Sequence, residues 1–254
     1  MSVETLYKYG RLGEHSESLF STPTIWFASP ASLNDPFECR PWLEFAGTDE
    51  QLVSLFVRVL RRQSPNLSEV DALDKALAIL QEGRHRDPRF WDFFRKDVGR
   101  LLATDIGICC LTKTNTNILM WSHYAADHQG YCLEFAATDS TPFFCEAQEV
   151  SYSSAFPVVN FFSTPHETQV DLIFLTKYEG WRYEEEYRIV DHQAGAGLHS
   201  YPPELLRSVT FGLRMCEEDR QTIRKWLKVR DQEVKVFEAT IHDREFKIVP
   251  LEVQ

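Results

Sequence analysis

The pattern of apolar and polar residues predicts strands at several points along the chain. Residues 24–28, TIWFA, combine β-branched and aromatic residues, and residues 106–112, IGICCLT, form the continuous apolar run of a buried strand. The same reasoning predicts further strands at 4–9, 131–135, 181–190 and 208–212, and a C-terminal hairpin formed by EVKVFEATI and FKIVPLEV. Strand-forming segments therefore occupy both ends of the chain.

The segment 49–104 follows a helical pattern instead. Its first part has apolar residues at helical spacing, at Leu52, Leu55, Phe56 and Val59. Thr48 or Asp49 is expected to cap this helix, and two similar patterns follow. No linker rich in Gly, Ser or Pro separates the segment from its flanks. We therefore expect an insertion of about three helices within a single domain of residues 1–254.

Three further helices are predicted outside this insertion. Residues 118–127 should form the first, capped by Asn115 or Asn117 and closed by Gly130 in the left-handed conformation. Residues 165–179 should form the second, and EEDRQTIRKWLK the third. Strands and helices alternate without a βαβ rhythm, and the sequence has no glycine-rich phosphate loop. The predicted fold class is therefore α+β, with a mixed, mostly antiparallel sheet.

Composition and charge narrow the range of functions. The chain has 254 residues, of which 43% are hydrophobic, and this excludes a disordered protein. Its net charge of -11 disfavours nucleic acid and anionic membranes as partners. None of the six cysteines forms a C-x-x-C pair, and no apolar run reaches the ~20 residues of a membrane helix. The chain opens MSVETLYKYG, without the apolar core of a signal peptide, so we expect a cytoplasmic protein.

The segment WRYEEEYRIV carries the first candidate chemistry. On a strand, Glu184 and Glu186 share one face, with Arg182 and Arg188 on either side of them. Two close carboxylates raise one pKa, while guanidinium groups keep the other carboxylate ionised. This pattern suits acid–base or electrostatic catalysis. A solvent-facing strand with charges of alternating sign explains it equally well.

The segment MWSHYAADHQG is the second candidate. On a helix, Trp121 and Tyr124 share one face, and His123 and Asp127 lie one turn apart on another. A carboxylate beside a histidine orients the ring and raises its pKa, as in acid–base pairs. The alternative is that the aromatic residues belong to the core and that His123 and Asp127 form a surface pair.

Polar residues near the first two strands complete the candidate site. Ser29 lies at the end of a strand, and the turn LNDPFE supplies Asn34, Asp35 and Glu38. An ordinary Asx-Pro turn is the alternative for this segment.

The first strand, LYKY, supplies two further candidates. Tyr7 lies on one face of this strand, and Lys8 points to the opposite face, where it could receive a phosphate or a carboxylate. A surface lysine is the commoner case. We expect all these stretches to meet in one cleft.

Taken in order, the four motifs resemble a large family of bacterial and phage-associated proteins of unknown function. The resemblance rests on LYKY, LNDPFE, LMWSHYA with a downstream G-x-CLEF, and WRYEEEYRI, and it runs from Leu6 to about Val190. The family itself implies no activity.

The same order of residues also resembles mono-ADP-ribosyltransferases. That resemblance implies NAD as co-substrate, with Lys8 or Tyr7 holding it and Ser29 shaping the nicotinamide pocket. It also implies that Glu186 stabilises the positive charge that develops on the ribose and that Glu184 activates the acceptor. Aromatic side chains that could stack on the bases are Trp121, Tyr124 and Trp181. A role as a toxin or in phage defence, acting on a protein or nucleic-acid acceptor, would follow. The chain departs from the pattern in having Lys rather than Arg or His on its first strand.

Two other functions remain open from the sequence. The first is a hydrolase, such as a nuclease or phosphodiesterase, that uses His123 with the two glutamates and Asp35, where the acidic residues could hold Mg²⁺. The second is a binding module without catalytic activity. No group of residues has the spacing of a zinc site, so no metal is predicted.

Overall fold

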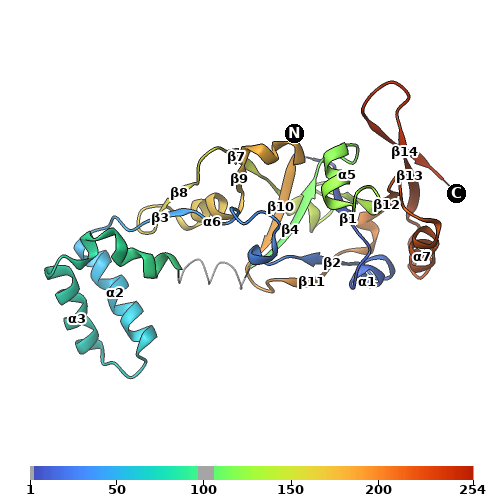
Figure 1. Cartoon of the computed structure of the whole chain (residues 1–254). Coiled ribbons are helices and arrows are strands. Elements are labelled where there is room, and N and C mark those ends of the chain that lie inside the picture. The colour runs from blue at the N-terminus through green and yellow to red at the C-terminus, as the bar shows by residue number, and fades with distance from the viewer. Residues whose placement is uncertain (1–2, 97–105, 254) are drawn as a thin grey trace. The chain divides into compact units, whose positions relative to one another are not determined.

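Eight strands form one sheet, as the computed structural model of the chain shows (Figure 1). The structure describes residues 3–96 and 106–253. From one edge to the other the strands are β14 (Ile248–Glu252), β13 (Lys235–Ile241), β12 (Leu206–Phe211), β5 (Tyr131–Ala136), β1 (Thr5–Gly10), β4 (Gly107–Thr112), β10 (Glu186–Asp191) and β6 (Gln148–Glu149). Strands β12 and β13 run parallel, and the other six neighbouring pairs are antiparallel. The predicted α+β fold with a mixed, mostly antiparallel sheet is confirmed.

Shorter elements surround this sheet. The strand β2 (Thr24–Phe27) pairs antiparallel with β11 (Gly197–Ser200), and β7 (Ser151–Ser153) pairs with β9 (Thr176–Tyr178). The helices are α1 (Ser16–Ser21), α5 (Ile118–Tyr124) and α7 (Glu217–Leu227). Single 3-10 turns are η1 (Pro30–Ser32), η4 (Phe144–Glu146), η5 (Glu179–Glu184) and η6 (Pro203–Leu205).

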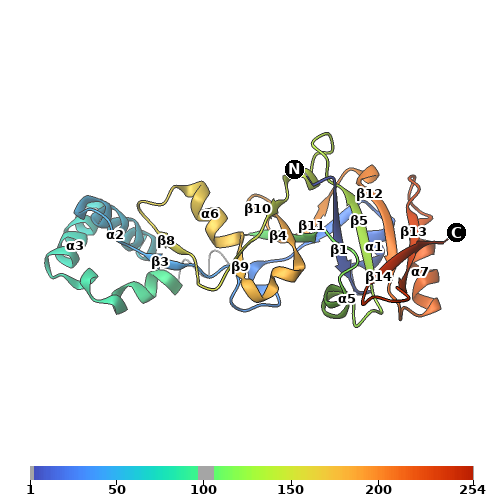
Figure 2. The ribbon, with the colours of Figure 1, turned by 90° about the horizontal axis from the view of Figure 1, so that it is seen from above.

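Helices cover both faces of the sheet. The helices α1 and α7 contribute Phe20, Ile223 and Leu227 to a core that includes Leu133 and Phe135 of β5. Figures 1 and 2 both show α7 beside β13. On the other face, α5 packs Met120 and Trp121 against Tyr9, Cys132, Ala239 and Ile248. Because successive residues of a strand point to opposite faces, β1 and β5 supply both cores.

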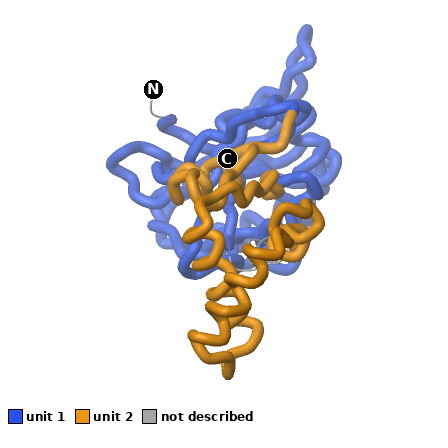
Figure 3. Tube along the Cα trace, turned by 90° about the vertical axis from the view of Figure 1, so that its left-hand side faces the viewer, with its two compact units in different colours: residues 1–38, 104–154, 177–254 blue, residues 39–103, 155–176 orange. Residues whose placement is uncertain are grey.

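The chain divides into two compact units, which Figure 3 colours separately. The sheet belongs to the first unit, residues 1–38, 104–154 and 177–254. The second unit, residues 39–103 and 155–176, contains α2 (Asp49–Gln63), α3 (Glu69–Gln81), α6 (His166–Phe174), the helical residues 92–96, the turns η2 (Arg84–Arg86) and η3 (Pro88–Trp91), and the parallel strands β3 (Trp42–Glu44) and β8 (Val158–Asn160). The predicted helical insertion is confirmed, although its residues 97–104 lie outside the described part of the chain. A single domain for residues 1–254 stays a prediction.

The predicted caps identify where two helices begin. The side chain of Thr48 accepts a hydrogen bond from the backbone N–H of Gln51, and the side chain of Gln51 accepts one from the backbone N–H of Thr48. These two bonds form a capping box at the start of α2. Asn117 accepts the backbone N–H groups of Leu119 and Met120 at the start of α5. In the described residues no helix is long and apolar enough to cross a membrane.

Two predicted helices are shorter in the structure. Residues 165–179 form α6 only as far as Phe174, and β9 follows directly. The helix predicted at 118–127 ends at Tyr124, because Ala126, Asp127 and His128 all have positive φ. Local apolar spacing does not reveal such a change of backbone direction.

Gly130 has a different role from the predicted helix closure. It is not among the glycines with positive φ in the described residues. Instead, a Cβ atom there would lie 2.1 Å from the carbonyl oxygen of Gly10. Its own carbonyl accepts the backbone N–H of Gly212 at 2.8 Å. A side chain is therefore excluded where β1 and the turn before β5 approach each other.

We expect Gly130→Ala to destabilise the protein by about 3 kcal/mol, because the new methyl group would have to displace backbone. Chemical unfolding of the full chain would measure this. Gly13→Ala is the matched control, since a Cβ at Gly13 meets nothing within 4 Å. Equal stability of the two variants would show that a methyl group fits at position 130 without displacing the backbone.

Candidate functional site

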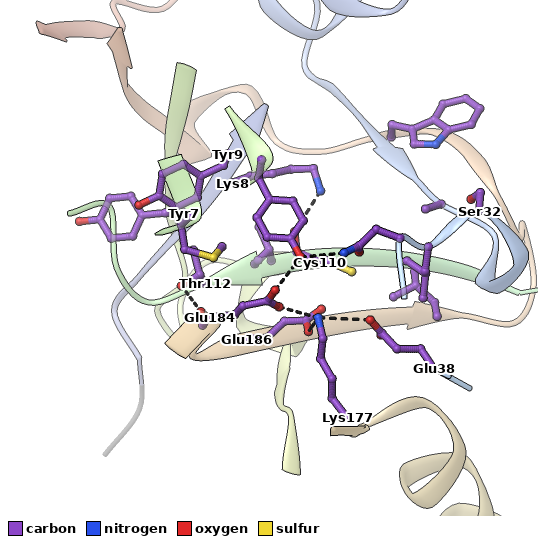
Figure 4. A pocket seen from close by; sticks show the side chains of 18 residues that line it. Tyr7, Lys8, Tyr9, Ser32, Glu38, Cys110, Thr112, Lys177, Glu184 and Glu186 are labelled. Carbon is purple, nitrogen blue, oxygen red and sulfur yellow. Dashed lines mark hydrogen bonds and ion pairs between the residues drawn. The ribbon is translucent and has the colours of Figure 1, made fainter. Parts of the chain in front are cut away.

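Lys177, in β9, is the centre of a buried cluster of charges in the first unit. Its Nζ lies 2.5 Å from Oε2 of Glu184, 3.0 Å from Oε2 of Glu186 and 3.2 Å from Oε1 of Glu38. Figure 4 shows the lysine pointing toward all three carboxylates. These four side chains are at most 4% exposed. Charges so deeply buried persist only when they are paired, so the four groups depend on one another.

Arg188 adds a second cation to the cluster. Its Nε donates to Oε1 of Glu186 at 2.7 Å, and its Nη2 donates to Oε2 of Glu186 at 2.9 Å and to Glu38. The Arg188 side chain is fully buried. Three carboxylates thus face two cations, and with all groups ionised the cluster carries one net negative charge.

The local backbone explains how two glutamates come to lie side by side. Residues 179–184 form the turn η5, Glu185 adopts the left-handed conformation with φ 45°, and β10 starts at Glu186. This kink turns Glu185 to solvent, where it pairs with Lys113 at 3.3 Å. Thr112 fixes the kink by donating to the carbonyl of Glu184 at 2.6 Å.

The predicted strand at 181–190 is therefore wrong for its first half. Glu184 and Glu186 are brought together, as strand alternation predicted, but by a turn and a left-handed residue. Arg182 does not flank them: it is exposed, and its guanidinium lies 5.3 Å from the ring of Tyr152. Arg188 alone takes the expected place.

A cavity of about 270 Å³ opens beside the charge cluster. Side chains from β1, β2 and α5 form much of its wall, among them Tyr7, Lys8, Tyr9, Trp26, Met120 and Tyr124. The hydroxyl of Tyr124 donates to Oε1 of Glu184 at 2.5 Å and accepts from Nδ2 of Asn34 at 3.1 Å. A ligand in this cavity would meet Tyr124 and Glu184 together.

The two neighbouring glutamates have pKa values displaced in opposite directions. Burial raises the pKa of Glu184, and the attraction of Lys177 and the hydrogen bond from Tyr124 offset only part of this effect. Burial acts the same way on Glu186, but Arg188 and Lys177 outweigh it and lower its pKa to about 2. Glu186 is therefore the firmly ionised member of the pair, and Glu184 is the one that binds a proton more readily.

The other groups of the site are held in their usual protonation states. Burial opposes the charge of Lys177, but Glu186, Glu38 and Glu184 outweigh it and raise the pKa of the ammonium. Burial and the charge of Glu184 raise the pKa of the Tyr124 hydroxyl. Burial, with Glu186 nearby, raises the pKa of the Cys110 thiol, which borders the cavity and is a poor nucleophile in this state.

Seven of the predicted site residues border the cavity: Tyr7, Lys8, Asn34, Glu38, Tyr124, Glu184 and Glu186. Three others support the cluster. Arg188 pairs with Glu186 and Glu38, and Asp35 accepts from Nε1 of Trp181 at 2.7 Å. The Trp181 ring also lies 5.3 Å from Nζ of Lys177, which is a cation–π contact.

Three predicted residues lie elsewhere. Ser29 donates to the hydroxyl of Ser32 at 3.2 Å, and Ser32 rather than Ser29 borders the cavity. Trp121 is fully buried and packs edge-on against Tyr9 in the core. His123 is exposed and its Nδ1 lies 2.8 Å from the hydroxyl of Tyr183. Because α5 ends at Tyr124, His123 and Asp127 are not one helical turn apart.

Lys177 is the functional residue that sequence reasoning missed. The helix predicted at 165–179 placed it near a helix end, where a lysine is solvated. The available signal was a single lysine just after the apolar run LIFL and just before a segment with four glutamates. Only the strand β9 reveals that this lysine points inward.

The carboxylates do not form a metal site of the usual kind. Within residues 3–96 and 106–253, no group of three His, Cys, Asp or Glu side chains has a geometry that could hold a metal ion. The ammonium of Lys177 lies at the point where Glu38, Glu184 and Glu186 converge.

We expect Lys177→Met to destabilise the protein by about 3–5 kcal/mol, because it leaves buried carboxylates without their shared cation. The matched control is Lys113→Met, which breaks the half-exposed pair with Glu185 and should cost less than about 1 kcal/mol. Urea unfolding at neutral pH compares the two variants. Similar decreases in the free energy of unfolding of the two variants would show that the buried cluster does not depend on Lys177.

The low pKa of Glu186 predicts a specific loss of stability in acid. Because this pKa is about 2 in the folded protein, against an ordinary value of 4.5, ionised Glu186 stabilises the fold above pH 4.5. The contribution, about 3 kcal/mol, disappears as pH falls through 2. The stability difference between the wild type and Glu186→Gln should therefore shrink from pH 6 toward pH 2.5 in unfolding experiments.

A difference that stays constant across this range would contradict the assignment. Glu185→Gln provides the control, because it breaks only the half-exposed pair with Lys113.

Comparison with known proteins finds a similarity to one family and no activity. Residues 120–189 match the model of a family described as protein of unknown function, DUF2971. No curated protein and no solved structure matches the chain. The matched segment includes Tyr124, Lys177, Glu184 and Glu186, so the family model covers the centre of the site. Over residues 120–189 the chain is thus similar to the DUF2971 family, whose function is unknown.

Proposed function

We propose that the cavity beside Glu184 is the active site of an enzyme that acts on a small organic ligand by proton transfer. The observation that carries this proposal is that Glu184 borders the cavity and is hydrogen-bonded there to Tyr124, whereas Glu186 is bonded to both cations. The raised pKa of Glu184 and the lowered pKa of Glu186 agree with these partners. Enzymes assign acid and base roles by such differences in environment. Glu184 is then the carboxyl that exchanges a proton.

The neighbouring groups fit supporting roles. The Tyr124 hydroxyl bonds to Glu184 and faces the cavity, so it can orient the ligand's reacting group toward the carboxyl. Glu186 has both oxygens hydrogen-bonded to Arg188 and Lys177. We therefore treat Glu186 as a positioning residue that holds Lys177 next to Glu184.

In its specific form, the proposed enzyme is an NAD-dependent ADP-ribosyltransferase. This form is supported by Tyr7 and Lys8 of the first strand, Ser32 after the second, and the late glutamates, which border one cavity. The bond between nicotinamide and ribose would break, and its electron pair would leave with nicotinamide. An acceptor hydroxyl or water would bond to the ribose carbon and give its proton to Glu184. A toxin or phage-defence role, with a protein or nucleic-acid acceptor, belongs to this form.

The geometry gives less support to a metal-assisted hydrolase that uses His123. This histidine bonds to Tyr183 and is not among the residues that border the cavity. Of the carboxylates that were candidates for Mg²⁺, Glu184 and Glu186 pair with Lys177, and Asp35 accepts from Trp181.

Incubation of the full chain with NAD tests the proposal. We expect release of nicotinamide, reduced about 100-fold or more in Glu184→Gln, because the proton acceptor is lost. Glu185→Gln changes the adjacent glutamate, which faces solvent, and should retain full activity. Circular dichroism would establish that both variants are folded.

Three results would contradict the proposal. No release of nicotinamide by the wild type, with protein and nucleic-acid acceptors supplied, would reject the NAD form. Equal activity in Glu184→Gln and the wild type would reject the role of Glu184. Ligand binding without any turnover would identify a binding module instead.

A further inference from the structure

A second cavity of about 390 Å³ adjoins the first within the same unit. The two cavities share Lys8, Tyr9 and Trp26 in their walls. The rest of its wall includes Arg11 and His15 of the segment that follows β1, Tyr131 and Leu133 of β5, and Leu198 of β11. A ligand longer than the first cavity could therefore extend past Lys8 into the second.

Lys8 differs from Lys177 in that no carboxylate among the described residues pairs with it. Its Nζ donates to the carbonyl of Cys110 at 2.9 Å, and in the described part of the chain it forms no ion pair. An ammonium has three N–H donors, and its charge is costly to hold away from water without an anion. The side chain is half-buried at the junction of the two cavities. This position favours an anionic group on the ligand.

The wall of the second cavity differs in charge from the rest of the protein. Lys8 and Arg11 contribute two cations, while Glu14 is its one acidic residue among those described. The whole chain has a net charge of -11. A local excess of positive charge in an acidic protein attracts anions to that place rather than to the surface as a whole.

Trp26 provides a flat aromatic surface beside these cations. It lies in β2, opposite Leu198 of β11, and the His15 ring stacks on it with centroids 4.6 Å apart and planes 9° apart. Trp26 is still 41% exposed. Exposed indoles next to a cavity are suited to stacking on planar rings. Trp26 can thus take the role predicted for Trp121, which is fully buried in the core.

From these features we infer that the two cavities together bind a ligand with an aromatic ring at one end and an anionic group near its middle. The ring would lie against Trp26 and the anion at Lys8, with the reacting end beside Glu184. Nucleoside phosphates have this chemistry. The inference deepens the proposed function and rests on it only for the position of the reacting end.

Isothermal titration calorimetry with the full chain tests the inference, with ADP, adenosine and inorganic pyrophosphate as probes at one ionic strength. We expect ADP to bind more tightly than either of the other two. Trp26→Ala should weaken ADP binding about tenfold and leave pyrophosphate unaffected, because only the stacking contact is lost. Lys8→Gln should weaken ADP and pyrophosphate about tenfold and leave adenosine unaffected.

Matched controls separate these effects from general changes. Trp42→Ala removes another exposed tryptophan, and Lys228→Gln removes another lysine; neither residue is among those that line the two cavities, so ADP binding should not change. Trp26→Phe keeps an aromatic ring and should retain most of the affinity.

The outcomes distinguish this inference from the proposed function. Failure of ADP to bind, equal binding of adenosine and ADP, or full affinity in both Trp26→Ala and Lys8→Gln would overturn the inference. ADP binding that depends on both residues, in a protein that turns over nothing, would support the inference and reject the proposed acid–base activity.

Discussion

The interaction on which the site depends is the sharing of one buried ammonium by three carboxylates. Removing a charge from water costs several kcal/mol, and this cost is met only where oppositely charged groups are held at hydrogen-bond distance. Lys177 and Arg188 meet this condition for Glu38, Glu184 and Glu186. The turn η5, the left-handed Glu185 and the bond from Thr112 can all be understood as the backbone arrangement that this convergence requires.

This network also explains why two adjacent carboxylates differ. Glu186 is bonded to both cations, whereas Glu184 is bonded to Lys177 and to a neutral phenol. The difference in their pKa values therefore arises from the number of cations that each one contacts. The carboxylate with fewer cationic partners is also bonded to Tyr124, which faces the cavity.

Much of the fold could be predicted because its signals are local. Apolar runs at 106–112 and 131–135 correspond to the central strands β4 and β5, and Thr48 and Asn117 begin helices through contacts within a few residues. The site was only partly predictable, since its centre is non-local. Glu184 and Glu186 were expected to face the same way, but the inward direction of Lys177 depends on a strand that the apolar spacing did not reveal.

The positions of Glu38 and Lys177 along the chain have a further consequence. Glu38 is the last residue of the first unit before the chain enters the second, and Lys177 is the first residue after its final return. These two residues form an ion pair in the interior of the first unit. The first departure from the first unit and the final return to it are thus tied together by buried charge, so the residues at which these two connections begin and end are fixed inside the first unit itself.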